Sequence, residues 1–123
     1  MVSALAGIAF LMGSHAWAAD CTPGAKELQV LSGGRAHRIA LVLPASMMTG
    51  KTVPLVIGLH PSGGTGQSLD ADTGLLAAAT ARGFAVMLPD GAIRTDDGTG
   101  FFWNIPGVPL VSGAEVPPGT RDD

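Results

Sequence analysis

Two runs of mixed polar and apolar residues follow the N-terminal twenty residues of the chain. These runs, residues 26–31 and 35–43, are extended segments of the kind that form β-strands. Ser32, Gly33 and Gly34 separate them. Because glycine readily adopts the positive φ that a tight turn requires, this spacing predicts a β-hairpin.

The middle of the chain has the order strand, helix, strand. Residues 53–59 are an almost uninterrupted apolar run, which predicts a strand covered on both faces. Residues 68–82 have the Ala/Leu-rich composition of a helix, weakened locally by Gly74 and ended by Gly83 as the C-cap. A second short apolar strand follows at residues 84–88. This order predicts a parallel β-α-β crossover and an α/β fold class.

The periodicity fades in the last third of the chain. Residues 89–123 are rich in glycine and proline, and we expect one long loop there. The triplet Phe101-Phe102-Trp103 gives this loop an aromatic cluster that can dock onto the rest of the domain.

Composition narrows the classes of function. The 123 residues include 46% hydrophobic and 14% charged residues, as in a globular chain. Seven Lys and Arg against ten Asp and Glu give a formal net charge of -3, and no basic run is present, so nucleic acid is not an expected partner. One Cys and three His exclude a disulfide framework and a Cys/His zinc cluster, so we expect neither a metal nor a cofactor.

The N-terminus has the form of an export signal. Residues 1–19 carry no Lys, Arg, Asp or Glu, and an apolar stretch leads to the small residues Ala16 and Ala18. These predict cleavage after Ala18, or after Ala19, so that the mature chain starts near Asp20 and is secreted without a stable membrane anchor. The alternative is an uncleaved anchor, but the segment is barely long enough to cross a bilayer.

Export would place the single cysteine, Cys21, in an oxidising compartment. There it is either a free thiol or paired with a cysteine that this sequence does not contain. The second option suggests polypeptide beyond the given sequence.

The densest candidate chemistry follows the apolar strand, in residues 60–68 (HPSGGTGQS). One interpretation is a phosphate-binding loop. That motif requires a leading glycine where Pro61 stands and a lysine where Gln67 stands, which argues against it. A second interpretation makes Ser62 a nucleophile in a Gly-x-Ser-x-Gly-like elbow. His60 is too bulky for the first position of that elbow, and no histidine follows it in the chain to act as the base.

A third interpretation is an oxyanion loop, a turn that aims a backbone N–H at the negative oxygen of a tetrahedral intermediate. Pro61 has no N–H, so the donor would be the amide of Ser62, with Gly63 as the second choice. His60 would brace the loop through side-chain hydrogen bonds rather than transfer protons. A glycine-rich turn without function stays as the alternative.

Several segments together resemble the polyhydroxybutyrate depolymerase and feruloyl esterase-like group of secreted α/β-hydrolases. The segments, in chain order, are residues 34–38 (GRAHR), 43–44 (LP), 54–60 (PLVIGLH), the glycines that follow, 82–91 (RGFAVMLPDG), Trp103 and 121–123 (RDD). Pro61 departs from the glycine that is more usual after the histidine. The resemblance covers nearly all of the mature chain but only the first part of the family's domain.

The resemblance implies that residues 20–123 are the N-terminal portion of an α/β-hydrolase domain. It implies that the nucleophilic serine, the acid and the catalytic histidine lie beyond Asp123. Of this chain, residues 60–64 would carry over as the contributor of one oxyanion donor, with His60 and Gly64 beside the substrate. Trp103 would either line the acyl or alcohol pocket or anchor the loop by packing.

The sequence therefore predicts an exported serine esterase acting on a polyester, a short acyl ester or a feruloyl ester. The alternative is a non-catalytic secreted module that binds polymer or glycan on the aromatic triplet. The sequence leaves the oligomeric state open. Among weaker candidates, Arg94 could meet an acidic substrate, although a lone loop arginine seldom does, and Asp96-Asp97 has the look of an exposed turn rather than a metal site.

Overall fold

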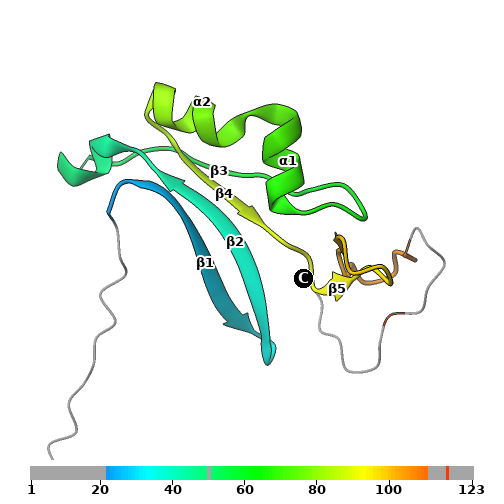
Figure 1. Ribbon diagram of the computed structural model, residues 1–123. Coiled ribbons are helices and arrows are strands. Elements are labelled where there is room, and N and C mark those ends of the chain that lie inside the picture. Colours follow the sequence, from blue (N-terminus) through cyan, green and yellow to red (C-terminus); the bar gives the residue numbers. More distant parts are fainter. Residues whose placement is uncertain (1–21, 50, 111–115, 117–123) are drawn as a thin grey trace, which may run out of the picture.

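The computed structural model describes residues 22–49, 51–110 and 116, and this part of the chain is a mixed α/β structure. A four-stranded sheet has the order β1-β2-β4-β3, and a separate two-stranded sheet pairs β5 with β6. Two helices lie on one face of the larger sheet, over β2 and β4 (Figure 1). The elements are β1 (Gly24–Ser32), β2 (Arg35–Leu43), a 3-10 helix (Ala45–Thr49), β3 (Leu55–Ile57), α1 (Gly66–Thr73), α2 (Leu75–Arg82), β4 (Ala85–Pro89), β5 (Ile93–Arg94) and β6 (Phe101–Phe102).

The predicted β-hairpin is confirmed. β1 and β2 pair antiparallel, and Ser32 lies opposite Arg35, so Gly33 and Gly34 alone make the turn. Both glycines have positive φ, 58° and 79°. This is the conformation that the right-handed twist of the two strands selects in a two-residue loop.

The predicted crossover is confirmed, but its single helix over residues 68–82 is wrong. β3 and β4 pair parallel, and two helices connect them. Gly74 adopts the left-handed conformation, φ 66°, and ends α1 by donating its N–H to the Asp70 carbonyl. The Asp70 carboxylate then accepts from the Leu76 amide at 2.8 Å and caps the start of α2. Gly83 has φ 75° and ends α2, as predicted.

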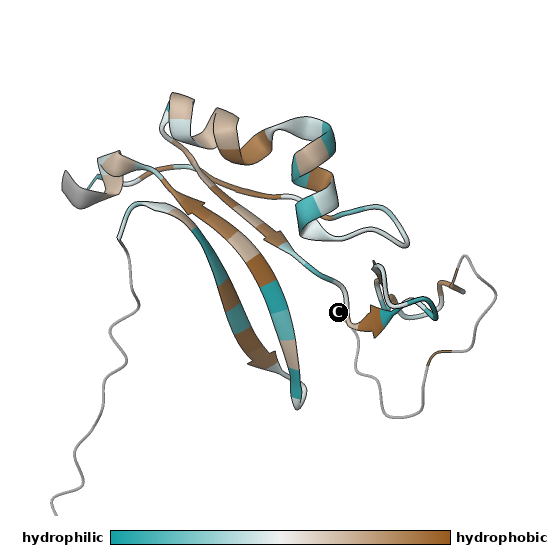
Figure 2. Ribbon diagram, in the orientation of Figure 1, coloured by the Kyte–Doolittle hydropathy of each residue, from teal (hydrophilic) through white to brown (hydrophobic). Residues whose placement is uncertain are grey.

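The core lies between the helices and the sheet. The fully buried side chains come from β2, α2 and β4, and they are Val42, Ala79, Val86 and Leu88. Partly buried apolar residues of both helices pack around them. In Figure 2, β4 and the half of β2 near its arrowhead are coloured mainly apolar, whereas the half of β2 next to the hairpin turn is largely hydrophilic.

The expectation that residues 53–59 form a strand covered on both faces is wrong for this structure. Only Leu55–Ile57 pair as β3, at the edge of the sheet, and their side chains are exposed. Leu59 is 62% exposed. An apolar run fits burial on both faces, but β3 is at the end of the sheet, and the two helices pack mainly over β2 and β4, so the apolar side chains of β3 meet solvent.

The expectation of one long loop after residue 89 is also wrong, because β5 and β6 pair antiparallel within it. The connection between them is organised by Asp97, whose Oδ1 accepts from the Thr95 hydroxyl and from the Thr99 amide and hydroxyl. The Thr95 hydroxyl bond, followed by the two from Thr99, lowers the pKa of the Asp97 carboxyl to about 2. A carboxylate with three donors closes a turn that the hydrophobic pattern does not predict.

The predicted export signal, residues 1–19, lies outside the described residues, as do Cys21 and residues 121–123. Among the helices that the structure does describe, none has both the length and the hydropathy to cross a membrane.

Candidate functional site

The loop at the end of β3 is a tight turn held by its own backbone. We call residues 60–64 the glycine loop. The Gly64 amide donates to the Pro61 carbonyl at 2.9 Å, so Pro61 and Gly64 are the ends of a four-residue turn. Gly63, its third residue, has φ 82°. Positive φ at that position is the mark of a type II turn and explains why a glycine stands there.

The second hairpin fastens the glycine loop from outside. The Gly63 amide donates to the Phe101 carbonyl at 2.9 Å, and the Phe101 amide donates to the Gly64 carbonyl at 2.8 Å. A Cβ on Gly100 would collide with the Gly63 backbone, so the two segments are in direct contact. The Gly63 N–H is therefore already used inside the protein. Within the described part of the chain, the exposed Ser62 is the residue of this turn whose amide donates no hydrogen bond.

His60 supports the glycine loop from the inside. Its side chain is 2% exposed. Nε2 accepts from the Gly91 amide at 3.1 Å, and Nδ1 lies 2.9 Å from the Pro61 carbonyl. Because a backbone N–H only donates and a carbonyl only accepts, the ring carries its proton on Nδ1 and both nitrogens are occupied. This is the bracing geometry that the sequence predicts for His60.

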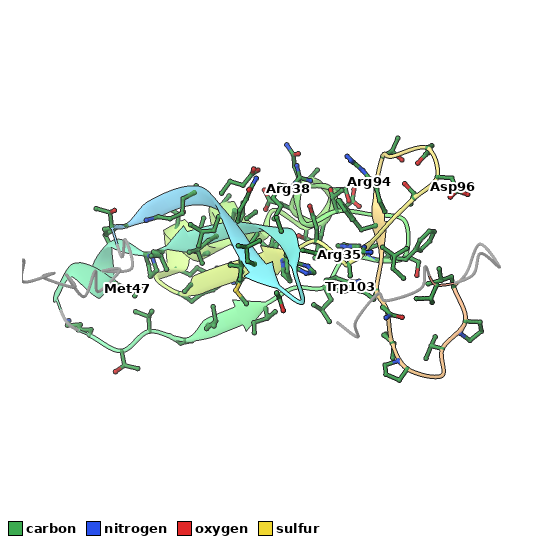
Figure 3. The ribbon with its side chains drawn as sticks, turned by 90° about the horizontal axis from the view of Figure 1, so that it is seen from below. Arg35, Arg38, Met47, Arg94, Asp96 and Trp103 are labelled. Carbon is green, nitrogen blue, oxygen red and sulfur yellow. The ribbon has the colours of Figure 1, made fainter. Side chains whose placement is uncertain are left out.

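Trp103 completes this arrangement. Its ring stacks on the His60 imidazole with centroids 4.6 Å apart, and its Nε1 donates to the His60 carbonyl at 2.8 Å. Trp103 also lines an open cleft of about 430 Å³ that runs along β2. Arg35 lines the same cleft and lies near Trp103 in Figure 3. The ring is therefore a packing anchor, as one of the two interpretations expected; a role in an acyl or alcohol pocket stays a prediction.

The aromatic triplet does not present three rings on one surface. Phe101 and Phe102 are successive residues of β6, and successive side chains of a strand point to opposite faces. Trp103 is half-buried against His60. This geometry argues against a flat aromatic platform for polymer or glycan.

Sequence reasoning missed the carboxylate that ties this region together. Asp90, 3% exposed, directly follows β4; its Oδ2 accepts from Arg38 Nε at 2.8 Å and its Oδ1 from the Gly66 amide at 2.8 Å. Asp90 thus joins β2, the end of β4 and the first turn of α1, where a negative charge is favourable. The available signal was its position, because residues after parallel strands gather at one edge of a sheet.

Buried His60 thus connects the rest of the glycine loop with Gly91 and Trp103, and Asp90 precedes Gly91 in the chain. Ser62 is exposed and lines neither this cleft nor a second, more polar cleft that includes Arg38 and Arg94. Across the described residues, no group of three or more His, Cys, Asp or Glu side chains is placed to hold a metal ion. No protein-family model, curated protein or solved structure matches the chain.

Proposed function

We propose that this chain provides the oxyanion-binding loop of an exported carboxylic-ester hydrolase of α/β-hydrolase fold. The observation that carries the proposal is the Ser62 amide. Ser62 is exposed, and its amide donates no hydrogen bond within the described residues, while the neighbouring Gly63 and Gly64 amides hold the turn that follows the parallel strand β3. The mixed α/β sheet is compatible with that fold class.

An amide in this position suits the chemistry of ester cleavage. Attack on an ester carbonyl places negative charge on its oxygen, and a donor that is already oriented stabilises that charge without reorganisation. The glycine loop is fixed by Phe101 outside and by His60 inside, so the direction of the Ser62 N–H is set before a substrate arrives. Removing one such donor costs about 3 kcal/mol of transition-state stabilisation.

The same geometry disfavours Ser62 as the nucleophile. A nucleophilic serine needs a base within hydrogen-bond reach, and His60 is the nearest histidine in sequence. Both of its ring nitrogens are engaged, with Gly91 and with Pro61. In our proposal the nucleophile, its base and its acid are therefore other residues, which we expect after Asp123 from the resemblance described above. The acyl group, whether polyester, short acyl or feruloyl, is not assigned.

The first test is the coding sequence downstream of codon 123. The proposal expects a Gly-x-Ser-x-Gly elbow within about fifty residues of Asp123. A stop codon directly after codon 123 contradicts the proposal, and so does an open reading frame that continues without such an elbow. Peptide mapping of the secreted protein, with an N-terminus at Ala19 or Asp20, checks the expected export.

The second test uses the enzyme encoded by that continuous reading frame. Ser62 occupies the second position of its turn, where proline is well tolerated, so Ser62→Pro removes the N–H and keeps the turn. We expect Ser62→Pro to lower kcat for p-nitrophenyl butyrate by about 100-fold or more, because one oxyanion donor is lost. The matched control, Ser62→Ala, keeps the amide and should change kcat only slightly.

Circular dichroism and thermal melting of both variants monitor the fold. Equal losses of kcat in the two variants would show that the side chain, and not the backbone amide, matters. An unchanged kcat in Ser62→Pro would remove the oxyanion role altogether.

A further inference from the structure

A polar cleft of about 540 Å³ lies between the first hairpin and the β5–β6 hairpin, and Ser62 is not among its lining residues. Four parts of the fold build it: β2, the beginning of α1, the end of β4 and the β5–β6 hairpin. The side chains important here are Arg38, Thr65, Gln67, Arg94 and Phe101. Arg38 and Arg94 lie near one another in Figure 3, with Asp96 farther out along the hairpin.

Two guanidinium groups face this cleft with donors to spare. Arg38 uses Nε to bind Asp90, and its terminal amino groups have no partner within the described residues. Arg94 lies over the Phe101 ring, 5.8 Å from its centroid, and makes no ion pair with another described residue. Stacking on an aromatic face leaves the edge of a guanidinium, where its N–H groups are, available to an acceptor.

The acid in this cleft does not neutralise both arginines. Asp90 is the single carboxylate in the lining, and its two oxygens are taken by Arg38 Nε and by the Gly66 amide. Two cationic side chains against one anionic side chain leave a formal charge of +1 in a chain whose net charge is -3. The cleft therefore concentrates positive charge where the rest of the protein is acidic.

We propose that this cleft binds the carboxylate group of a small organic acid. A carboxylate is planar and carries one charge, which matches the fork of a guanidinium and the excess of one positive charge. The Gln67 side-chain amide offers a further donor at the same opening. The Phe101 ring and the Ala36 methyl group provide an apolar wall for the carbon skeleton. The proposal does not depend on ester hydrolysis or on the family resemblance.

The experiment is a titration of the ¹⁵N-labelled chain with sodium butyrate, with sodium chloride at the same ionic strength as the reference. We expect saturable shifts of the Arg38 and Arg94 Nε signals and of the Gly91 and Thr99 amides, which line the cleft. Arg94→Gln should raise the Kd for butyrate about tenfold, because a charge-assisted hydrogen bond is lost. Arg94 is exposed, so the variant keeps the fold.

The matched control is Arg82→Gln, which changes the net charge equally at the end of α2, away from the cleft lining. It should leave the Kd unchanged. An equal weakening in both variants would mean general charge attraction and would overturn the proposal, as would the absence of saturable shifts at millimolar butyrate. A second titration with inorganic phosphate tests the ligand class, because phosphate binding as tightly as butyrate would overturn the assignment to carboxylates.

Discussion

Replacing His60 by alanine tests whether the buried imidazole holds the glycine loop in place. The substitution removes the acceptor for the Gly91 amide, the donor to the Pro61 carbonyl and the ring on which Trp103 stacks. We expect a large loss of stability, since a residue that is 2% exposed and has both polar atoms paired is replaced by a methyl group.

The magnitude follows from three contributions. Gly91 is buried, so its unpaired N–H costs about 1–3 kcal/mol. Loss of the aromatic stacking with Trp103 costs about 0.5–1.5 kcal/mol. Pro61 is exposed, so its carbonyl exchanges the lost bond for water and contributes little. The sum is about 3 kcal/mol of unfolding free energy.

Two further variants separate the contributions. Glutamine can place its amide oxygen near the position of Nε2 and keep the bond from Gly91, whereas asparagine reaches only the position of Nδ1 and the Pro61 carbonyl. His60→Gln should therefore be less destabilising than His60→Asn, and His60→Asn no more destabilising than His60→Ala.

Urea unfolding followed by far-UV circular dichroism measures these differences, and hydrogen exchange reports on the Gly91 amide directly. We expect that amide to lose its protection in the alanine and asparagine variants and to keep it in the glutamine variant. A destabilisation below about 1 kcal/mol for His60→Ala, or an order in which asparagine is better than glutamine, refutes the reasoning.

Three other predictions concern the surrounding network. Asp90→Ala should lower the unfolding free energy by about 2 kcal/mol because the buried Gly66 amide loses its acceptor, and Asp90→Asn, which keeps an oxygen there, by less; urea unfolding that shows equal losses would contradict this. Gly100→Ala forces a Cβ into the Gly63 backbone, whereas at Gly107 a Cβ meets open space and only the positive φ is unfavourable. Gly100→Ala should therefore lower the melting temperature more than Gly107→Ala, and the reverse order would contradict the observed packing. The pKa of Asp97 is lowered from 3.8 to about 2. The stability that its carboxylate gives to the β5–β6 connection is therefore complete above pH 3.8 and is lost as the pH falls through 2. An NMR titration of its carboxyl carbon with a midpoint near 3.8 would show that the threonine bonds do not form in solution.

The sequence pattern was sufficient for features that depend on nearby residues. Two extended runs and the Gly33-Gly34 pair between them predicted the first hairpin, because strand-forming composition and turn conformation are both local properties. Gly83 predicted the end of α2 for the same reason. The break at Gly74 was underestimated because the Asp70 side chain, by capping Leu76, favours a second helix start that the apolar spacing does not encode.

The sequence also located the glycine loop and assigned His60 a supporting role. A histidine and several glycines directly after an apolar strand restrict what the turn can do, and proline at position 61 leaves Ser62 as the first amide. The sequence did not show which backbone amides of the loop are left without an acceptor inside the protein. Gly63 was the second candidate donor, and its use by Phe101 depends on a hairpin that the pattern described as loop.

By itself, therefore, the sequence determined the first hairpin, the strand-helix-strand order, the end of α2 and the turn that could present a backbone donor, because φ preferences and hydrophobic period act over a few residues. Only the tertiary structure decided which groups are paired. The bond from Gly91 to His60 spans 31 residues of sequence and the Arg38–Asp90 pair spans 52. Partners so far apart meet because β2 and β3 both pair with β4, and the hydrophobic pattern of each strand carries no information about which strand becomes its neighbour.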